Sequence, residues 1–159
     1  MAVRILIKDV KIPILFRGLL NRDVTGVKIP AFVPAAADTC LAAVYQGNDG
    51  ATLAVCVCDL DLVSYAGAAL VLVQPPVAKE AIATRKLDPG LTENFQEILN
   101  ICATLLTGPD IPHVKLGPSY ANRADWPDEV VKFVAPARSS AAMKITIAGY
   151  GAGRIGIFT

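Results

Sequence analysis

Hydrophobic and polar residues between positions 91 and 107 alternate with the period of an α-helix. The apolar residues predict one buried stripe, formed by Leu91, Phe95, Ile98, Leu99, Cys102, Leu105 and Leu106. On the opposite side we expect an exposed row of Glu93, Glu97, Asn100, Thr104 and Thr107. Asp88 is the expected N-cap, Pro89 the first helical residue, and Gly108 with Pro109 the end of the helix. Glu97 and Asn100 therefore project side by side, about one turn apart.

The remaining patterns predict strands and shorter helices around this helix. Strands are expected at residues 1–7, 39–46, 51–58, 113–116, 129–135, 143–148 and 154–158, and Pro30 allows at most an edge strand at 27–33. Helices are expected at 12–21, from Asp59 or Asp61 to about residue 73, and as a short helix or turn at 77–86. Turns are expected at 47–50 and 149–153. We predict a single α+β domain over residues 1–159, with helices packed on a mostly antiparallel sheet and no internal repeat.

Composition narrows the class of protein. Of 159 residues, 53% are hydrophobic and 18% are charged, so we expect both faces of the sheet, or a homodimer interface, to be well buried. The longest apolar run, residues 62–73, is too short for a bilayer, which takes about 20 residues, and the first residues lack a signal-peptide pattern. A cytoplasmic protein without a membrane partner is the expectation. The net charge of +1, without a basic run, argues against nucleic-acid binding.

Cysteines, a histidine and a glycine-rich segment are the other candidates for chemistry. The four cysteines are Cys40, Cys56, Cys58 and Cys102, and we interpret them as buried free thiols. A zinc site would need them to converge with one another or with His113, and their spacing matches no standard zinc motif. A hydrolase that uses His113 stays open. Residues 151–156 match G-x-G-x-x-G, but with only residues 157–159 after them we interpret the match as a turn, not a nucleotide site. Trp126 either covers the core or marks a partner surface.

The order of elements and the sequence Glu97-Ile98-Leu99-Asn100 resemble the CheC/CheX family of chemotaxis phosphatases. In that family a strand hairpin leads into a helix of small residues and then into a helix with an E-x-x-N motif. Here these parts are residues 40–58, 61–73 and 97–100, and the strand at 143–148 also fits. Gln96 stands where the family has a small residue, no glycine follows Asn100 closely, and a second E-x-x-N is absent. The resemblance covers the organisation from Thr39 onward and specific residues in this one helix.

The resemblance implies a protein that docks on a response-regulator receiver domain and hydrolyses its aspartyl phosphate. Asn100 would place the attacking water, because a carboxamide donates and accepts hydrogen bonds without adding charge. Glu97 would pair with the receiver's lysine, and Glu93 would lengthen the acidic strip. Magnesium would belong to the receiver, so no cofactor of its own is expected for this chain. Two alternatives stay open: a non-catalytic scaffold or dimerisation module of the same fold, and a row that only keeps the helix solvated.

Overall fold

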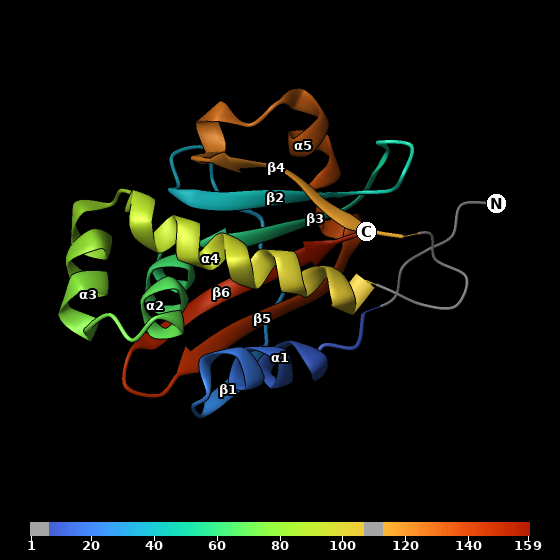
Figure 1. Cartoon of the computed structure of the whole chain (residues 1–159). Coiled ribbons are helices and arrows are strands. Elements are labelled where there is room, and N and C mark those ends of the chain that lie inside the picture. The colour runs from blue at the N-terminus through green and yellow to red at the C-terminus, as the bar shows by residue number, and fades with distance from the viewer. Residues whose placement is uncertain (1–6, 107–112) are drawn as a thin grey trace.

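The strands form one antiparallel sheet in the computed structural model, which describes residues 7–106 and 113–159 (Figure 1). Its order is β1-β5-β6-β3-β2-β4. The strands are β1 (Val24–Lys28), β2 (Cys40–Gln46), β3 (Thr52–Asp59), β4 (Lys115–Ala121), β5 (Ser139–Ile147) and β6 (Gly151–Phe158). The helices are α1 (Lys11–Leu20), α2 (Leu60–Leu70), α3 (Pro75–Thr84), α4 (Pro89–Cys102) and α5 (Asp128–Phe133). The predicted α+β class is confirmed.

Helices α1, α2 and α4 cover one face of the sheet (Figure 1). Alternate strand residues point to this face, so Leu41, Ala43 and Tyr45 of β2 share a buried cluster with Phe95 of α4. Gly67 lets α2 approach α4 closely, because a Cβ at this position would collide with the carbonyl oxygen of Leu91. The helices on this face therefore pack backbone against backbone at one point.

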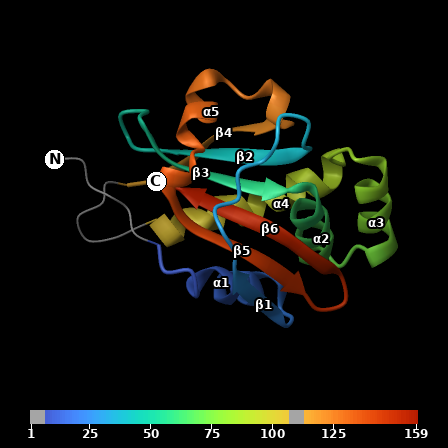
Figure 2. The same cartoon turned by 180° about the vertical axis from the view of Figure 1, so that it is seen from behind.

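The opposite face carries a second, smaller core (Figure 2). Cys40, Ala42 and Val44 of β2 belong to it, and α5 and the segment between β1 and β2 cover it. Trp126 is only 6% exposed in this core, which decides that it covers the core and is not a surface contact. Burial on both faces explains the almost continuous apolar run of β2 and much of the high apolar content.

Helix α5 shows that the strand predicted at residues 129–135 was wrong. A short apolar run cannot be assigned from its period alone, because four or five such residues fit a strand and a helix equally well. Asp128 and Glu129 lie in the first turn, where carboxylates favour the helix N-terminus. Val130 and Val134 lie one helical turn apart, and both are buried against the sheet.

Other boundaries lie within a few residues of the prediction. Asp59 and Asp88 are the N-caps of α2 and α4, and each carboxylate accepts a backbone N–H at 2.9 Å. Helix α2 ends at Leu70, and Pro75 begins α3. β1 is an edge strand that ends before Pro30, β4 continues to Ala121, and β6 begins inside the expected turn. The strand predicted at 1–7, apart from Ile7, and the helix end at Gly108 and Pro109 lie outside the described residues.

The sheet order contains an internal repeat that the sequence prediction missed. Segments α1-β1-β2-β3 and α4-β4-β5-β6 follow the same order of one helix and three strands, apart from α5 and two 3₁₀ turns between β4 and β5. Their strands are arranged symmetrically about the central pair β3 and β6. One trace of the repeat remains in the sequence, where FRGLLN at residues 16–21 matches FQEILN at residues 95–100. Helices α1 and α4 are therefore equivalent elements, and Gly18 occupies the position of Glu97.

Candidate functional site

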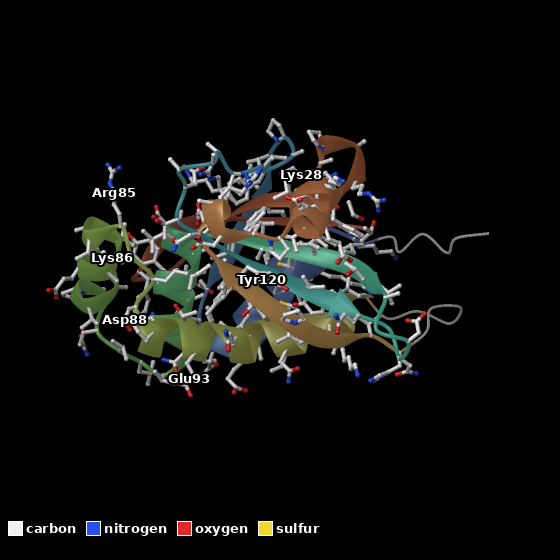
Figure 3. The ribbon with its side chains drawn as sticks, turned by 90° about the horizontal axis from the view of Figure 1, so that it is seen from above. Lys28, Arg85, Lys86, Asp88, Glu93 and Tyr120 are labelled. Atoms are coloured by element: carbon white, nitrogen blue, oxygen red, sulfur yellow. The ribbon has the colours of Figure 1, made fainter. Side chains whose placement is uncertain are left out.

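Helix α4 presents the predicted row of polar side chains to solvent. Glu93, Glu97 and Asn100 are exposed, while the predicted apolar stripe is buried at Leu91, Phe95, Ile98, Leu99, Cys102 and Leu106. Figure 3 shows Asp88 at the beginning of α4 and Glu93 on its outer side. Thr104 is exposed in the 3₁₀ turn that follows, and Thr107 lies outside the described residues. The structure thus places the two predicted site residues, Glu97 and Asn100, on one accessible helix face.

No hydrogen bond or ion pair engages the side chains of Glu93, Glu97 or Asn100 within residues 7–106 and 113–159. The ion pairs in that part of the chain join Lys28 to Asp9 and Arg154 to Asp59, away from α4. Two carboxylates one turn apart repel each other weakly, by a few tenths of a kcal/mol. Glu93, Glu97 and Asn100 are therefore free to pair with groups supplied by another molecule.

Three hydrogen bonds hold the other sides of α4 in place. The Asn94 amide donates to the Gly67 carbonyl at 3.1 Å, which joins α4 to α2. Gln96 donates to the hydroxyl of Ser119 at 3.1 Å, which joins α4 to β4. The Tyr45 hydroxyl donates to the Leu99 carbonyl at 2.5 Å, next to Asn100. These bonds fix the rotation of α4, and the sequence analysis identified none of the partner residues.

The equivalent face of α1 does not reproduce this row. Gly18 replaces the glutamate, and Ile14, which is exposed, stands at the position equivalent to Glu93. Asn21 is not inside a helix: it follows the end of α1 with left-handed backbone angles of φ 50° and ψ 47°. Of these two equivalent helices, only α4 combines a carboxylate with a carboxamide one turn later.

All four cysteines are free and buried, as predicted. Cys56 and Cys58 point to the same face, with their sulfurs 3.9 Å apart, and Cys40 lies on the other face of the sheet. Burial raises the pKa of Cys40 to about 12 and raises the pKa values of Cys58 and Cys102. Thiols held protonated are poor nucleophiles and poor metal ligands. Among the described residues, no three Cys, His, Asp or Glu side chains are placed to hold a metal ion.

A polar groove of about 500 Å³ lies at the beginning of α2, away from the α4 row. Asp61, Arg154 and Phe32 are among the residues that line it. Both oxygens of the neighbouring Asp59 are engaged, one by the backbone of Leu62 and the other by Arg154 at 3.1 Å. Burial, and then the charge of Asp59, raise the pKa of Asp61. The groove is thus lined by a helix cap and an ion pair that already serve the fold.

Comparison with known proteins identifies the fold. No family model matches the chain, and no curated protein resembles it significantly in sequence. The structure resembles the FliM middle domain from Vibrio alginolyticus, with 13% identity, 95% of this chain and 87% of that chain covered, and a TM-score of 0.60. It also resembles FliM in a FliM–SpeE complex from H. pylori, with 11% identity, 93% and 81% covered, and a TM-score of 0.58. FliY from Thermotoga maritima is 16% identical, with 91% and 80% covered and a TM-score of 0.51.

The chain has the fold of the FliM middle domain. This fold is of the CheC/CheX type, so the resemblance seen in the sequence is supported at the level of fold. At 11–16% identity the likeness shows the fold alone, and the chemistry has to be argued from the residues of α4. Within the described residues, no helix combines the length and apolar character needed to cross a membrane.

Proposed function

We propose that this chain is a cytoplasmic signalling domain, spanning residues 1–159, that docks on a phosphorylated receiver domain through α4 and hydrolyses its aspartyl phosphate. The observation that carries the proposal is the exposed pair of Glu97 and Asn100, which have no partner within the described chain. The same pair occupies the E-x-x-N positions of a CheC/CheX-like fold. The fold supports a setting in chemotaxis or the flagellar switch, because its solved relatives are FliM and FliY structures.

This chain would have to contribute only one catalytic function, the placement of the attacking water. An aspartyl phosphate on a receiver lies beside the receiver's own magnesium ion and lysine, which supply the charge stabilisation. What remains is to hold one water in line with the phosphorus–oxygen bond that breaks. The Asn100 carboxamide accepts one hydrogen bond from that water and donates another to a neighbouring oxygen. Glu97 pairs with the receiver's lysine and sets the register in which Asn100 meets the phosphoryl group.

The rigidity of α4 supports this proposal. Water placement contributes to rate only when the positioning group is already in place, because an error of about 1 Å can cost about 100-fold in rate. Hydrogen bonds from Asn94, Gln96 and Tyr45 hold α4 against two neighbouring elements and the sheet beneath it. Asn100 is thus presented by a helix that is held on three sides.

A non-catalytic docking module is the second candidate. One solved relative was crystallised as a FliM–SpeE complex, so at least one protein of this fold binds another protein. Ile101, next to Asn100, is 39% exposed and gives the face an apolar contact that hydrolysis does not need. A docking module, including one that forms a homodimer through this face, would bind its partner and leave the lifetime of the phosphoryl group unchanged.

The test is the decay of phosphorylated receivers from the same organism, with and without this protein. We expect one receiver to lose phosphate faster, and Asn100→Ala to return that receiver to its intrinsic rate. Glu80→Ala, an exposed change on α3, is the control and should keep the wild-type rate. Full activity in the Asn100 variant would refute the catalytic role, and binding without any acceleration would establish the docking module.

A further inference from the structure

Tyr45 makes a hydrogen bond from the sheet to α4, at the residue before Asn100. It comes from β2, is 1% exposed, and donates its hydroxyl to the carbonyl oxygen of Leu99 at 2.5 Å. That carbonyl belongs to the peptide group that joins Leu99 to Asn100. The direction in which the Asn100 side chain leaves the helix depends on the orientation of this peptide plane.

The same bond coincides with the end of the α-helical hydrogen-bond pattern. In a continuing α-helix, the Leu99 carbonyl would accept the N–H of residue 103. The N–H of Ala103 also approaches the carbonyls of Asn100 and Ile101, and the chain continues as a 3₁₀ turn over Ala103–Leu106. The Tyr45 hydroxyl thus adds a side-chain donor to a carbonyl in the last turn of α4, at the residue before Asn100.

Tyr45 is itself held rigidly. β2 is an inner strand, and Tyr45 is paired with Ala54 of β3 and with Leu116 of β4, next to a register shift in each pairing. Burial raises the pKa of Tyr45 well above its ordinary value, which keeps the hydroxyl protonated and able to donate. A donor with these properties fixes the geometry of its acceptor.

The internal repeat provides a comparison within the same chain. In the equivalent half, β5 takes the place of β2 in the strand order and carries the apolar residues Ile145 and Ile147, which have no hydroxyl. There the asparagine equivalent to Asn100, Asn21, has left-handed backbone angles beyond the helix end. The half with the tyrosine keeps its asparagine helical, and the half without it does not.

We propose that Tyr45 is a positioning residue for Asn100, which it orients by binding the carbonyl of the preceding peptide group. The inference rests on the proposed function for its effect on catalysis, but its structural part stands independently. Removing the hydroxyl breaks the hydrogen bond between β2 and the last turn of α4, so the peptide group before Asn100 loses the contact that fixes the direction of the Asn100 side chain.

The experiment compares Tyr45→Phe with Tyr150→Phe. Tyr150 is the matched control, because its hydroxyl also donates to a carbonyl near a helix end, that of Val73 at 2.6 Å, far from α4. Both variants lose one hydroxyl and keep the ring. For receiver dephosphorylation, we expect Tyr45→Phe to lower kcat about tenfold or more with KM within about twofold, whereas Tyr150→Phe changes neither. If the two hydroxyls only stabilised the fold, both variants would have a smaller folded fraction, and the apparent kcat would fall by a similar factor in each.

NMR separates failure of this inference from failure of the proposed function. We expect the side-chain amide signals of Asn100 and the backbone amide of Ala103 to shift in Tyr45→Phe and to stay in place in Tyr150→Phe. Unchanged Asn100 signals in the Tyr45 variant would overturn the inference. An unchanged kcat, beside an Asn100-dependent wild-type activity, would overturn it as well. If no receiver responds to the wild-type protein, the proposed catalysis fails, and the NMR comparison alone decides whether Tyr45 orients Asn100.

Discussion

At Gly67 the backbones of α2 and α4 lie in close contact, and Gly67→Ala measures how tightly the site helix is held. The added methyl group would overlap the carbonyl oxygen of Leu91, which belongs to the α4 backbone and cannot move aside as a side chain would. Overpacking a core costs about 1–3 kcal/mol, and a backbone collision belongs at the upper end of that range. Alanine in a helix gains about 1 kcal/mol over glycine. The net expectation is a loss of about 2 kcal/mol.

Thermal and urea unfolding give the magnitude. For a chain of this length, 1 kcal/mol corresponds to about 2–4 °C, so Gly67→Ala should lower Tm by about 4–8 °C. Gly18→Ala is the matched control, because a Cβ at this position in α1 meets nothing within 4 Å. It should raise stability by about 0.5–1 kcal/mol through helix propensity alone. If Gly67→Ala were neutral or stabilising, as Gly18→Ala is expected to be, the close contact between α2 and α4 would be refuted.

Two further predictions concern a strained residue and the buried thiols. Leu72 is 68% exposed and has a φ of 59°, the left-handed position after α2 that normally favours glycine. Leu72→Gly should therefore raise the free energy of unfolding by about 0.5–1 kcal/mol. A lower free energy of unfolding would show that the Leu72 side chain contributes packing. The four thiols should react with DTNB at pH 8 far more slowly in the native protein than in denaturant, because burial raises the pKa values of Cys40, Cys58 and Cys102; rapid native labelling would contradict the two buried cores.

The internal repeat allows the exposed faces of α1 and α4 to be compared position by position. Helices α1 and α4 are equivalent, yet their exposed residues differ: α4 has Glu97 where α1 has Gly18. One half of the chain therefore exposes Glu93 and Glu97 on this helix face, while the other half exposes Ile14 and Gly18 at the same positions. The single working site that we propose follows from this divergence between the two halves.

Local signals along the sequence were sufficient for most helices and strands. The beginning of α4 at Asp88, the beginning of α2 at Asp59 or Asp61, and the β2–β3 turn at 47–50 were predicted from the sequence, because each depends on neighbours within a few residues. The structure decided for Asp59. Residues 129–135 show the limit, since a short run of valines and a phenylalanine has no decisive period. Its assignment as α5 depends on the sheet face that it covers.

By itself, the sequence determined the α+β class and the two faces of α4, because the period of apolar residues decides which side of a helix is buried. It therefore also determined that Glu97 and Asn100 share one exposed face. Only the tertiary structure decided what holds that face in place. Tyr45 and Leu99 are 54 positions apart, and no local pattern connects a strand hydroxyl to a helix carbonyl at that separation. The internal repeat was likewise established only by the sheet, because strand order depends on long-range pairing, and the short match of residues 16–21 with residues 95–100 is too brief to indicate a repeat by itself.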